Sequence, residues 1–288
     1  MLSEGRVSIG GIAAGAGRIV RKGEIVAFDP PPLEEPEVDS SYDILFEDED
    51  FLIVDKSGNL PSHPCGRFFK HSLWYLLRER YGELGIATRL DRETSGLVLA
   101  CRKPASAAYA EKLLAAGDIA KEYLVLAHGR FPSSFEARGY LVGDESSAIR
   151  LKRRFVEEPP SGGTKAEACA TSFELLGFID PPSDDGRTGR VGLLIARPRT
   201  GRTHQIRATL SSLGFPVLGD KLYGLDEGCF VRQFEGRLNQ EDLTRLILPN
   251  QALHCSSLSF KTLAGRSIRV KSQPRWGSPF AEELAALL

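Results

Sequence analysis

Short runs of hydrophobic residues, separated by polar turns, dominate the chain from residue 42 onward. Runs rich in leucine, isoleucine, valine and phenylalanine predict strands, at 44–46, 51–54, 97–101, 123–127, 173–176, 191–196, 253–260 and 267–271. Apolar positions at helical spacing predict helices, at 72–81, 105–116, 202–213 and from 279 onward. Because these elements interleave without the strict period of βαβ units, we expect an α+β fold with a central mixed, largely antiparallel sheet flanked by helices and loops.

Glycines and prolines set residues 1–38 apart from this pattern. Short strand-like runs with glycines between them occupy residues 6–28, and Pro30, Pro31, Pro32 and Pro36 then predict a stiff, acidic linker. We therefore expect residues 1–38 to form an N-terminal extension with its linker, and residues 39–288 to form the main domain.

The composition is typical of a globular protein, with 42% hydrophobic and 26% charged residues. No apolar stretch approaches the roughly 18 residues that a membrane helix needs, and residues 9–17 are too short and too glycine-rich for the core of a secretion signal. The five cysteines form no Cys-x-x-Cys pair, which argues against a disulfide framework and a zinc site. We expect a cytoplasmic protein with reduced thiols, no metal and no membrane partner.

The net charge of −1 averages segments of opposite sign. Residues 24–55 carry twelve acidic side chains and neither lysine nor arginine, whereas residues 186–219 carry six arginines and no acid. Residues 243–281 are also basic and free of acids. Local density of lysine and arginine favours a nucleic-acid partner, because phosphate affinity follows local charge. The alternative is that the unlike segments neutralise one another in the fold.

Three polar motifs bring candidate chemistry, in a fixed order along the chain. Residues 89–96 read RLDRETSG and lead into the apolar run 97–100. Arginines beside Asp91 hold its carboxylate ionised, so that it can act as a nucleophile or base, although such turns are also common on solvated surfaces. The other two motifs are Lys121-Glu122-Tyr123 and residues 201–207, which read GRTHQIR.

Together these motifs resemble the RluA-type family of RNA pseudouridine synthases, over about residues 42–275. The resemblance implies isomerisation of specific uridines in structured RNA to pseudouridine, without metal or cofactor. It implies that Asp91 is the catalytic aspartate, that Arg207 is its ionic partner and that Tyr123 packs on the target base. Whether Asp91 attacks C1′, attacks C6 or removes a ribose proton stays open.

The resemblance also implies residues that contact RNA. A uracil inside folded RNA must be extruded, which costs a few kcal/mol of stacking, and Arg89 is expected to fill the space that it leaves. We expect further RNA contacts from Arg202 and His204, and from Lys152 and Arg153 in a basic run that could equally be an ordinary solvated hairpin. Both His204 and His254 are expected to be hydrogen-bonded residues and not metal ligands.

Several features depart from the family pattern or leave alternatives open. Thr88 stands where many members have histidine, Ser57 replaces a proline, and Cys255 replaces an alanine after Leu253-His254. Residues 21–26 resemble the closing hairpin of an S4 RNA-binding module whose helical half is missing, so this segment could equally be a covering flap or a tether. These departures motivate a second hypothesis, a catalytically silent RNA-binding protein that keeps the fold.

A third hypothesis, a glycosidase that acts on free nucleosides or sugars, lacks the second carboxylate that such enzymes place about 5–10 Å from the first. Within the leading hypothesis the RNA substrate stays open. Residues 63–67 resemble members that act on a tRNA anticodon stem-loop, whereas the S4-like segment favours rRNA. We expect the protein to act as a monomer.

Overall fold

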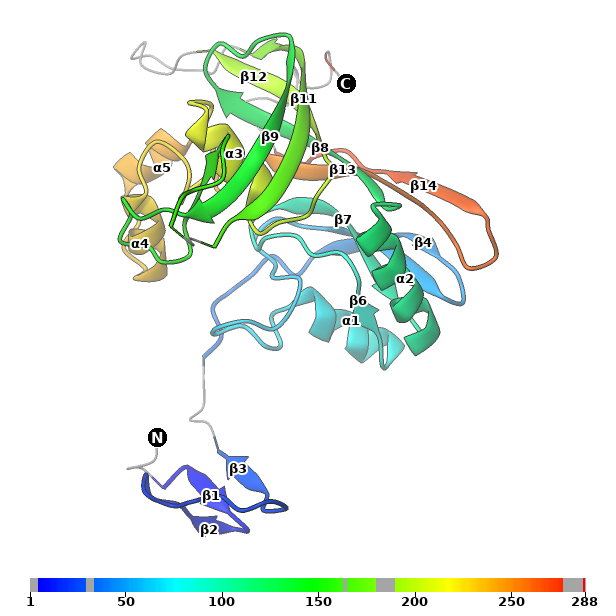
Figure 1. The fold of residues 1–288 in the computed structure, drawn as a ribbon, viewed down its shortest axis with the longest axis vertical. Helices are drawn as coiled ribbons and strands as arrows, with labels where there is room; N and C mark the ends of the chain where they lie inside the picture. The colour runs from blue at the N-terminus through cyan, green and yellow to red at the C-terminus, as the bar shows by residue number, and fades with distance from the viewer. Residues whose placement is uncertain (1–4, 30–33, 163–164, 180–189, 277–286, 288) are drawn as a thin grey trace.

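The computed structural model describes residues 5–29, 34–162, 165–179, 190–276 and 287. Within these residues, eleven strands form one sheet with a main path in the order β10-β9-β11-β12-β8-β13-β7-β5-β4, while β14 pairs with β13 and β6 with β7 (Figure 1). The strands are β4 (Tyr42–Glu47), β5 (Phe51–Lys56), β6 (Gly85–Ile86), β7 (Ser95–Cys101), β8 (Ala120–His128), β9 (Ser134–Gly143), β10 (Arg153–Val156), β11 (Glu167–Ile179), β12 (Val191–Pro198), β13 (Leu253–Lys261) and β14 (Ser267–Lys271).

The pairing confirms the predicted mixed, largely antiparallel sheet. Only β13 and β7 pair in parallel among the described strands, with His254 opposite Ser95 and Cys255 opposite Gly96. Strands β5 and β7 are buried almost throughout, which explains why they are continuous apolar runs without polar alternation.

Five helices accompany the sheet in the described part of the chain: α1 (Leu73–Tyr81), α2 (Pro104–Ala116), α3 (Gln205–Ser212), α4 (Gly228–Phe234) and α5 (Gln240–Leu246). Figure 1 shows α1 and α2 beside the half of the sheet that contains β4 and β7, and α3 with α4 and α5 beside the other half. The Ser72 hydroxyl caps α1, and Gly117 ends α2 in a left-handed conformation, at the residue where the sequence predicted the end of this helix.

Three helix predictions need comment. The helix expected from residue 202 begins instead at Gln205, because His204 has φ +58° and cannot continue an α-helix. The Gln205 side chain closes the preceding turn by accepting the backbone N–H of Arg202 at 3.0 Å. The sequence prediction omitted α4 and α5, which bury few apolar side chains. The helix expected from residue 279 falls outside the described residues apart from 287.

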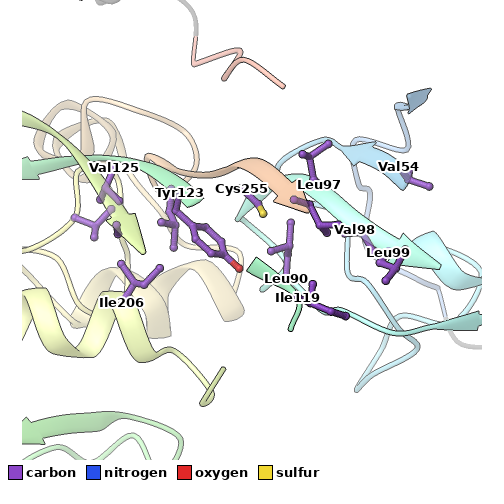
Figure 2. Packing of buried hydrophobic residues seen from close by; sticks show 14 of the residues in the cluster. Val54, Leu90, Leu97, Val98, Leu99, Ile119, Tyr123, Val125, Ile206 and Cys255 are labelled. Atoms are coloured by element: carbon purple, nitrogen blue, oxygen red, sulfur yellow. The ribbon is translucent and has the colours of Figure 1, made fainter. Parts of the chain in front are cut away.

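The hydrophobic core extends through the sheet and reaches the predicted site. Figure 2 shows Leu90, Tyr123 and Cys255 packed together with residues of β7 and with Ile206 of α3. Leu90 immediately precedes Asp91 and is only 9% exposed. The core therefore anchors the chain next to the aspartate. Among the described helices, none is long and apolar enough to cross a membrane.

The N-terminal segment forms a small sheet of its own, with strands β1 (Val7–Ile9), β2 (Ile12–Ala13) and β3 (Val26–Phe28) in the order β2-β1-β3. This confirms the predicted short strands, while their likeness to an S4 module stays a prediction. The linker is partly outside the described residues. Its end is attached to the main domain, because the Glu35 carboxylate accepts the backbone N–H groups of Phe69, Lys70 and His71.

Ion pairs join the acidic and basic segments that the sequence separates. Arg266 lies 3.4 Å from Asp48, and Arg275 pairs with Asp43. Arg197 contacts Glu122 at 2.7 Å. The folded chain thus partly neutralises its charged segments, which supports the alternative explanation of the charge pattern. These pairs are exposed and each stabilises the fold by about 1 kcal/mol at most.

Candidate active site

Asp91 lies in a turn, residues 91–94, that leads directly into β7. Two contacts fix the ends of this turn. The Ser62 hydroxyl donates to the Leu90 carbonyl at 2.8 Å and accepts the Leu90 N–H at 3.0 Å. Gly96 has φ +106°, and a Cβ atom there would lie 2.4 Å from the Cys255 carbonyl oxygen. Only glycine fits this contact, so the turn is held firmly against β13.

Arg207 reaches Asp91 from α3, as the sequence predicted. Its Nη1 lies 2.7 Å from Asp91 Oδ2. Nε and Nη2 of the same guanidinium bind Asp220, at 2.7 and 2.9 Å, a contact that no sequence motif indicated. Two carboxylates therefore share one arginine, and the two-pronged contact belongs to Asp220. Asp220 is 1% exposed. It follows α3 closely in the chain, and its carboxylate lies against the Arg207 guanidinium.

The pairing keeps both aspartates ionised. Burial raises the pKa of Asp91, but the positive charge of Arg207 outweighs it and leaves that pKa below its ordinary value. The same opposition lowers the pKa of Asp220, where backbone N–H groups add to the effect. The Asp220 side chain is fully buried, whereas 30% of the Asp91 side chain is exposed. Asp91 is thus the carboxylate that a substrate can reach.

Asp91 has one oxygen held and one available. Arg207 binds Oδ2, whereas no hydrogen bond from the described residues reaches Oδ1. The His204 Nε2 atom lies 3.9 Å from Oδ1. His204 was predicted to contact RNA, and the structure places it beside Asp91 instead of among the exposed arginines. Its Nδ1 lies 2.9 Å from the Tyr223 hydroxyl.

Tyr123 lies on β8 with its ring in the core and is 8% exposed. Cys255 is its neighbour on β13, and the two side chains interact. Burial raises the pKa of the Tyr123 hydroxyl well above its ordinary value, and the Cys255 and Asp91 charges act in the same direction. Tyr123 therefore keeps its proton at neutral pH and lies within electrostatic range of Asp91.

The other predicted RNA-contacting residues differ in how available their charges are. Arg89 is exposed and makes no hydrogen bond or ion pair with the described residues. Arg202 is also exposed, and its Nε lies 3.3 Å from the Ala168 carbonyl. Lys152 instead pairs with Glu227 at 2.6 Å and is 18% exposed. Arg153 pairs with Glu167 at 3.6 Å. Of these four residues, Arg89 and Arg202 are therefore the two without an ion pair among the described residues.

Three residues of the site were not assigned from the sequence: Asp220, Tyr223 and Lys56. Lys56 is 1% exposed and donates to the Arg92 carbonyl at 3.2 Å, which ties β5 to the Asp91 turn. Burial lowers the pKa of Lys56 to about 7. All three residues lie within residues 42–275, the part of the chain that resembles the family. That position was the signal in the sequence that could have assigned them to the site.

Metal-ligating side chains gather at one other place in the described part of the chain. Asp226, Cys229 and Asp242 lie close enough to share an ion. The Arg232 guanidinium already lies between them, with Nη2 at 2.6 Å from each carboxylate and 3.3 Å from the cysteine sulfur. A cation in this position compensates the carboxylates, so the cluster is an ion-pair network. His254 likewise binds hydroxyl groups, of Ser95 at 2.9 Å and Ser272 at 3.1 Å.

Known proteins resemble the part of the chain that contains Asp91, Tyr123 and Arg207. The sequence profile of the RNA pseudouridylate synthase family matches residues 50–212. An uncharacterized RNA pseudouridine synthase of Helicobacter pylori is 31% identical over 245 residues, which cover 84% of this chain and 76% of that protein. The tRNA pseudouridine(31) synthase of Saccharomyces cerevisiae is 29% identical over 225 residues, covering 71% of this chain and 53% of the yeast protein.

A solved structure shares the fold. Human RNA Pseudouridylate Synthase Domain Containing 1 superposes with a TM-score of 0.65 at 23% identity, over 88% of this chain and 90% of the human one. This chain spans about half the length of the yeast relative. The profile match covers more than half of the chain and includes Asp91, Tyr123 and Arg207. The chain belongs to the RNA pseudouridylate synthase family.

Proposed function

We propose that this protein is an RNA pseudouridine synthase in which Asp91 is the catalytic residue. The observation that carries the proposal is the state of the Asp91 carboxylate: its side chain is 30% exposed, Arg207 binds Oδ2, and no hydrogen bond from the described residues reaches Oδ1. An ionised, partly exposed carboxylate on a rigid turn is what attack on a glycosidic carbon or removal of a ribose proton requires. Family membership supports the same activity.

The reaction conserves the atoms of uridine. The N1–C1′ bond breaks, the base turns, C5 bonds to C1′, and a proton leaves C5 while N1 gains one. Asp91 assists departure of the base, either by bonding to the sugar or base or by taking a ribose proton. Tyr123 lies within electrostatic range of Asp91 and keeps its hydroxyl proton, which suits it to hold the base and assist proton movement at C5.

Recognition of the RNA is proposed to rest on the free cations near Asp91. Arg89 precedes Asp91 by two residues and its side chain is exposed, a position from which it can fill the space of an extruded uridine. Arg202 precedes α3 and is available to phosphates. Among possible substrates we propose tRNA first, because the yeast relative is named a tRNA pseudouridine(31) synthase.

Tritium release tests this proposal directly. Transcripts of tRNA and rRNA labelled with tritium at C5 of uridine are incubated with the purified protein, and pseudouridine formation releases the label to water. We expect release from tRNA, and a loss of about 10³-fold or more in Asp91→Asn protein. Asp242→Asn is the matched control, since Asp242 is also bound to an arginine, and it should keep wild-type release.

Two results would contradict parts of the proposal. Wild-type release by Asp91→Asn protein would remove Asp91 from the chemistry. RNA binding without release from any cellular RNA would favour the catalytically silent alternative.

Thr88, which motivated that alternative, is 4% exposed and its hydroxyl accepts the Leu99 N–H at 2.8 Å. It therefore stabilises the strand edge before Asp91 and does not disturb the carboxylate.

A further inference from the structure

His204 connects Asp91 to a second polar group, Tyr223. Its ring is 14% exposed, with Nδ1 2.9 Å from the Tyr223 hydroxyl oxygen and Nε2 3.9 Å from Asp91 Oδ1. The residue adopts φ +58°, which is uncommon for a side chain other than glycine or asparagine. The chain thus accepts a backbone conformation of higher energy that directs this ring between the two groups.

Hydrogen bonding at Tyr223 determines which nitrogen of His204 carries the proton. The backbone N–H of Arg153 donates to the Tyr223 hydroxyl oxygen at 3.0 Å. Burial raises the pKa of Tyr223, so its hydroxyl keeps a proton and must donate it. Within the described residues, the acceptor in range is His204 Nδ1. Nδ1 is therefore the unprotonated nitrogen.

The environment also keeps the ring neutral. Burial lowers the pKa of His204, and the charged groups that face it divide between the two signs. These groups come from the Asp91 turn, from α3, from the segment after α3 and from β10, and they are Asp91, Arg207, Asp220 and Arg153. A neutral imidazole with a bare Nδ1 carries its single proton on Nε2. That is the atom directed at Asp91 Oδ1.

We propose that His204 is a positioning residue for Asp91, and that its Nε2–H orients the reactive oxygen Oδ1 while Arg207 holds Oδ2. The inference rests on the proposed function. At 3.9 Å the contact is longer than a hydrogen bond, and such catalytic contacts commonly tighten when the substrate binds. A neutral donor orients the carboxylate without adding a full positive charge that would weaken it as a nucleophile or base.

Two substitutions separate the two ring nitrogens. His204→Asn places a carbonyl oxygen near the Nδ1 position, so it still accepts from Tyr223, and asparagine tolerates the left-handed backbone. It lacks the donor toward Asp91. His204→Gln can present an N–H near the Nε2 position. His71→Asn is the control, because His71 contacts the Pro36 carbonyl and belongs to no part of the Asp91 network.

Steady-state tritium release is measured for each variant with one tRNA substrate. We expect His204→Asn to lower kcat by about 10-fold or more, with KM and the melting temperature close to wild type, and His204→Gln to recover part of kcat. In addition, ¹⁵N NMR of histidine-labelled protein should show the His204 Nε2 protonated and Nδ1 unprotonated. Tyr223→Phe should remove this preference, since it removes the proton donated to Nδ1.

The outcomes distinguish the inference from the function on which it rests. Wild-type kcat in His204→Asn protein, or a protonated Nδ1 in the NMR spectrum, overturns the role of His204. The proposed function still stands in that case if the wild-type protein releases tritium. A wild-type protein that releases no tritium overturns the proposed function, and the role of His204 with it. A melting temperature that falls in step with kcat would assign His204 a purely structural role.

Discussion

Two of the arginines that the structure describes each hydrogen-bond to two aspartates, and the two clusters differ in burial and in which carboxylate oxygens have partners. They are the Arg207 cluster, with Asp91 and Asp220, and the Arg232 cluster, with Asp226 and Asp242. The Arg207 side chain is 8% exposed, whereas that of Arg232 is 31% exposed. The same chemical motif therefore lies in a buried setting in one place and near the surface in the other.

The difference shows what makes one cluster a candidate for catalysis. In the Arg232 cluster, too, one aspartate takes a two-pronged contact, since Nε and Nη2 of Arg232 bind Asp242. The second aspartate, Asp226, has both oxygens bound, one by Arg232 and the other by the Gly228 N–H at 2.8 Å. In the Arg207 cluster the fully buried Asp220 takes the two-pronged contact and fixes the arginine. Nη1 of the same guanidinium binds Asp91 Oδ2, and no hydrogen bond from the described residues reaches Asp91 Oδ1. The second aspartate therefore keeps an oxygen without a hydrogen bond from the described residues in the Arg207 cluster but not in the Arg232 cluster.

The largest expected contrast in stability comes from removing each arginine. Arg207→Met leaves two carboxylates without their buried partner, and breaking such a pair destabilises a fold by about 3–5 kcal/mol. Arg232→Met removes a partly exposed arginine, whose partner Asp226 is also partly exposed, and should lower the melting temperature less. Thermal unfolding of both variants at pH 7 measures the contrast, and tritium release should be lost only in Arg207→Met. Equal destabilisation would show that the burial difference is unimportant.

A second contrast concerns the tyrosine beside the Arg207 cluster. Tyr123→Phe removes a protonated hydroxyl near Asp91 and should lower kcat by about 10²-fold if that hydroxyl moves a proton, with RNA affinity unchanged. Tyr109→Phe is the matched control, since its hydroxyl donates to the Thr262 carbonyl on the sheet edge at 3.3 Å. Unchanged kcat in Tyr123→Phe protein would restrict the residue to packing against the base.

The surface cation next to Asp91 should differ from Arg232 in RNA binding. Arg89→Ala is expected to weaken RNA affinity about 3- to 10-fold and to reduce the slope of log affinity against log salt by about one if it contacts a phosphate. Arg232→Met should leave affinity and slope unchanged, because that guanidinium is engaged by two carboxylates. Fluorescence anisotropy across a salt series measures both. A similar loss in the two variants would indicate nonspecific charge attraction.

The smallest expected effect is the acid sensitivity of the Arg232 cluster. Arg232 lowers the pKa of Asp242 from 3.8 to about 2. A carboxylate with a lowered folded-state pKa stabilises the fold above its unfolded-state pKa, and this contribution is lost as the pH falls through the folded-state value. The melting temperatures of wild type and Asp242→Asn should therefore differ above pH 4 and converge toward pH 2. A difference that persists at pH 2 would point to lost packing.

Sequence patterns predicted the sheet and much of the site. The strands appeared as apolar runs because both faces of β5 and β7 are buried. The approach of Arg207 to Asp91, 116 residues apart, was implied by the resemblance of three motifs to the family. The start of α3 was predicted wrongly, because nothing local reveals that His204 takes a left-handed conformation. The signal for α5 was a capping pair, Asn239 and Asp242, without apolar spacing around it.

The sequence alone indicated most of the strands and the helices α1, α2 and α3, since hydrophobic periodicity is a property of the chain itself, and the resemblance of its motifs to a known family implied which site residues meet. Only the tertiary structure decided how the charges are shared. The fork of Arg207 goes to Asp220, and the pairing of Lys152 with Glu227 occupies a predicted RNA contact. Such choices depend on the directions of side chains from separate elements, which no local pattern encodes. They leave Oδ1 of Asp91 without a hydrogen bond from the described residues.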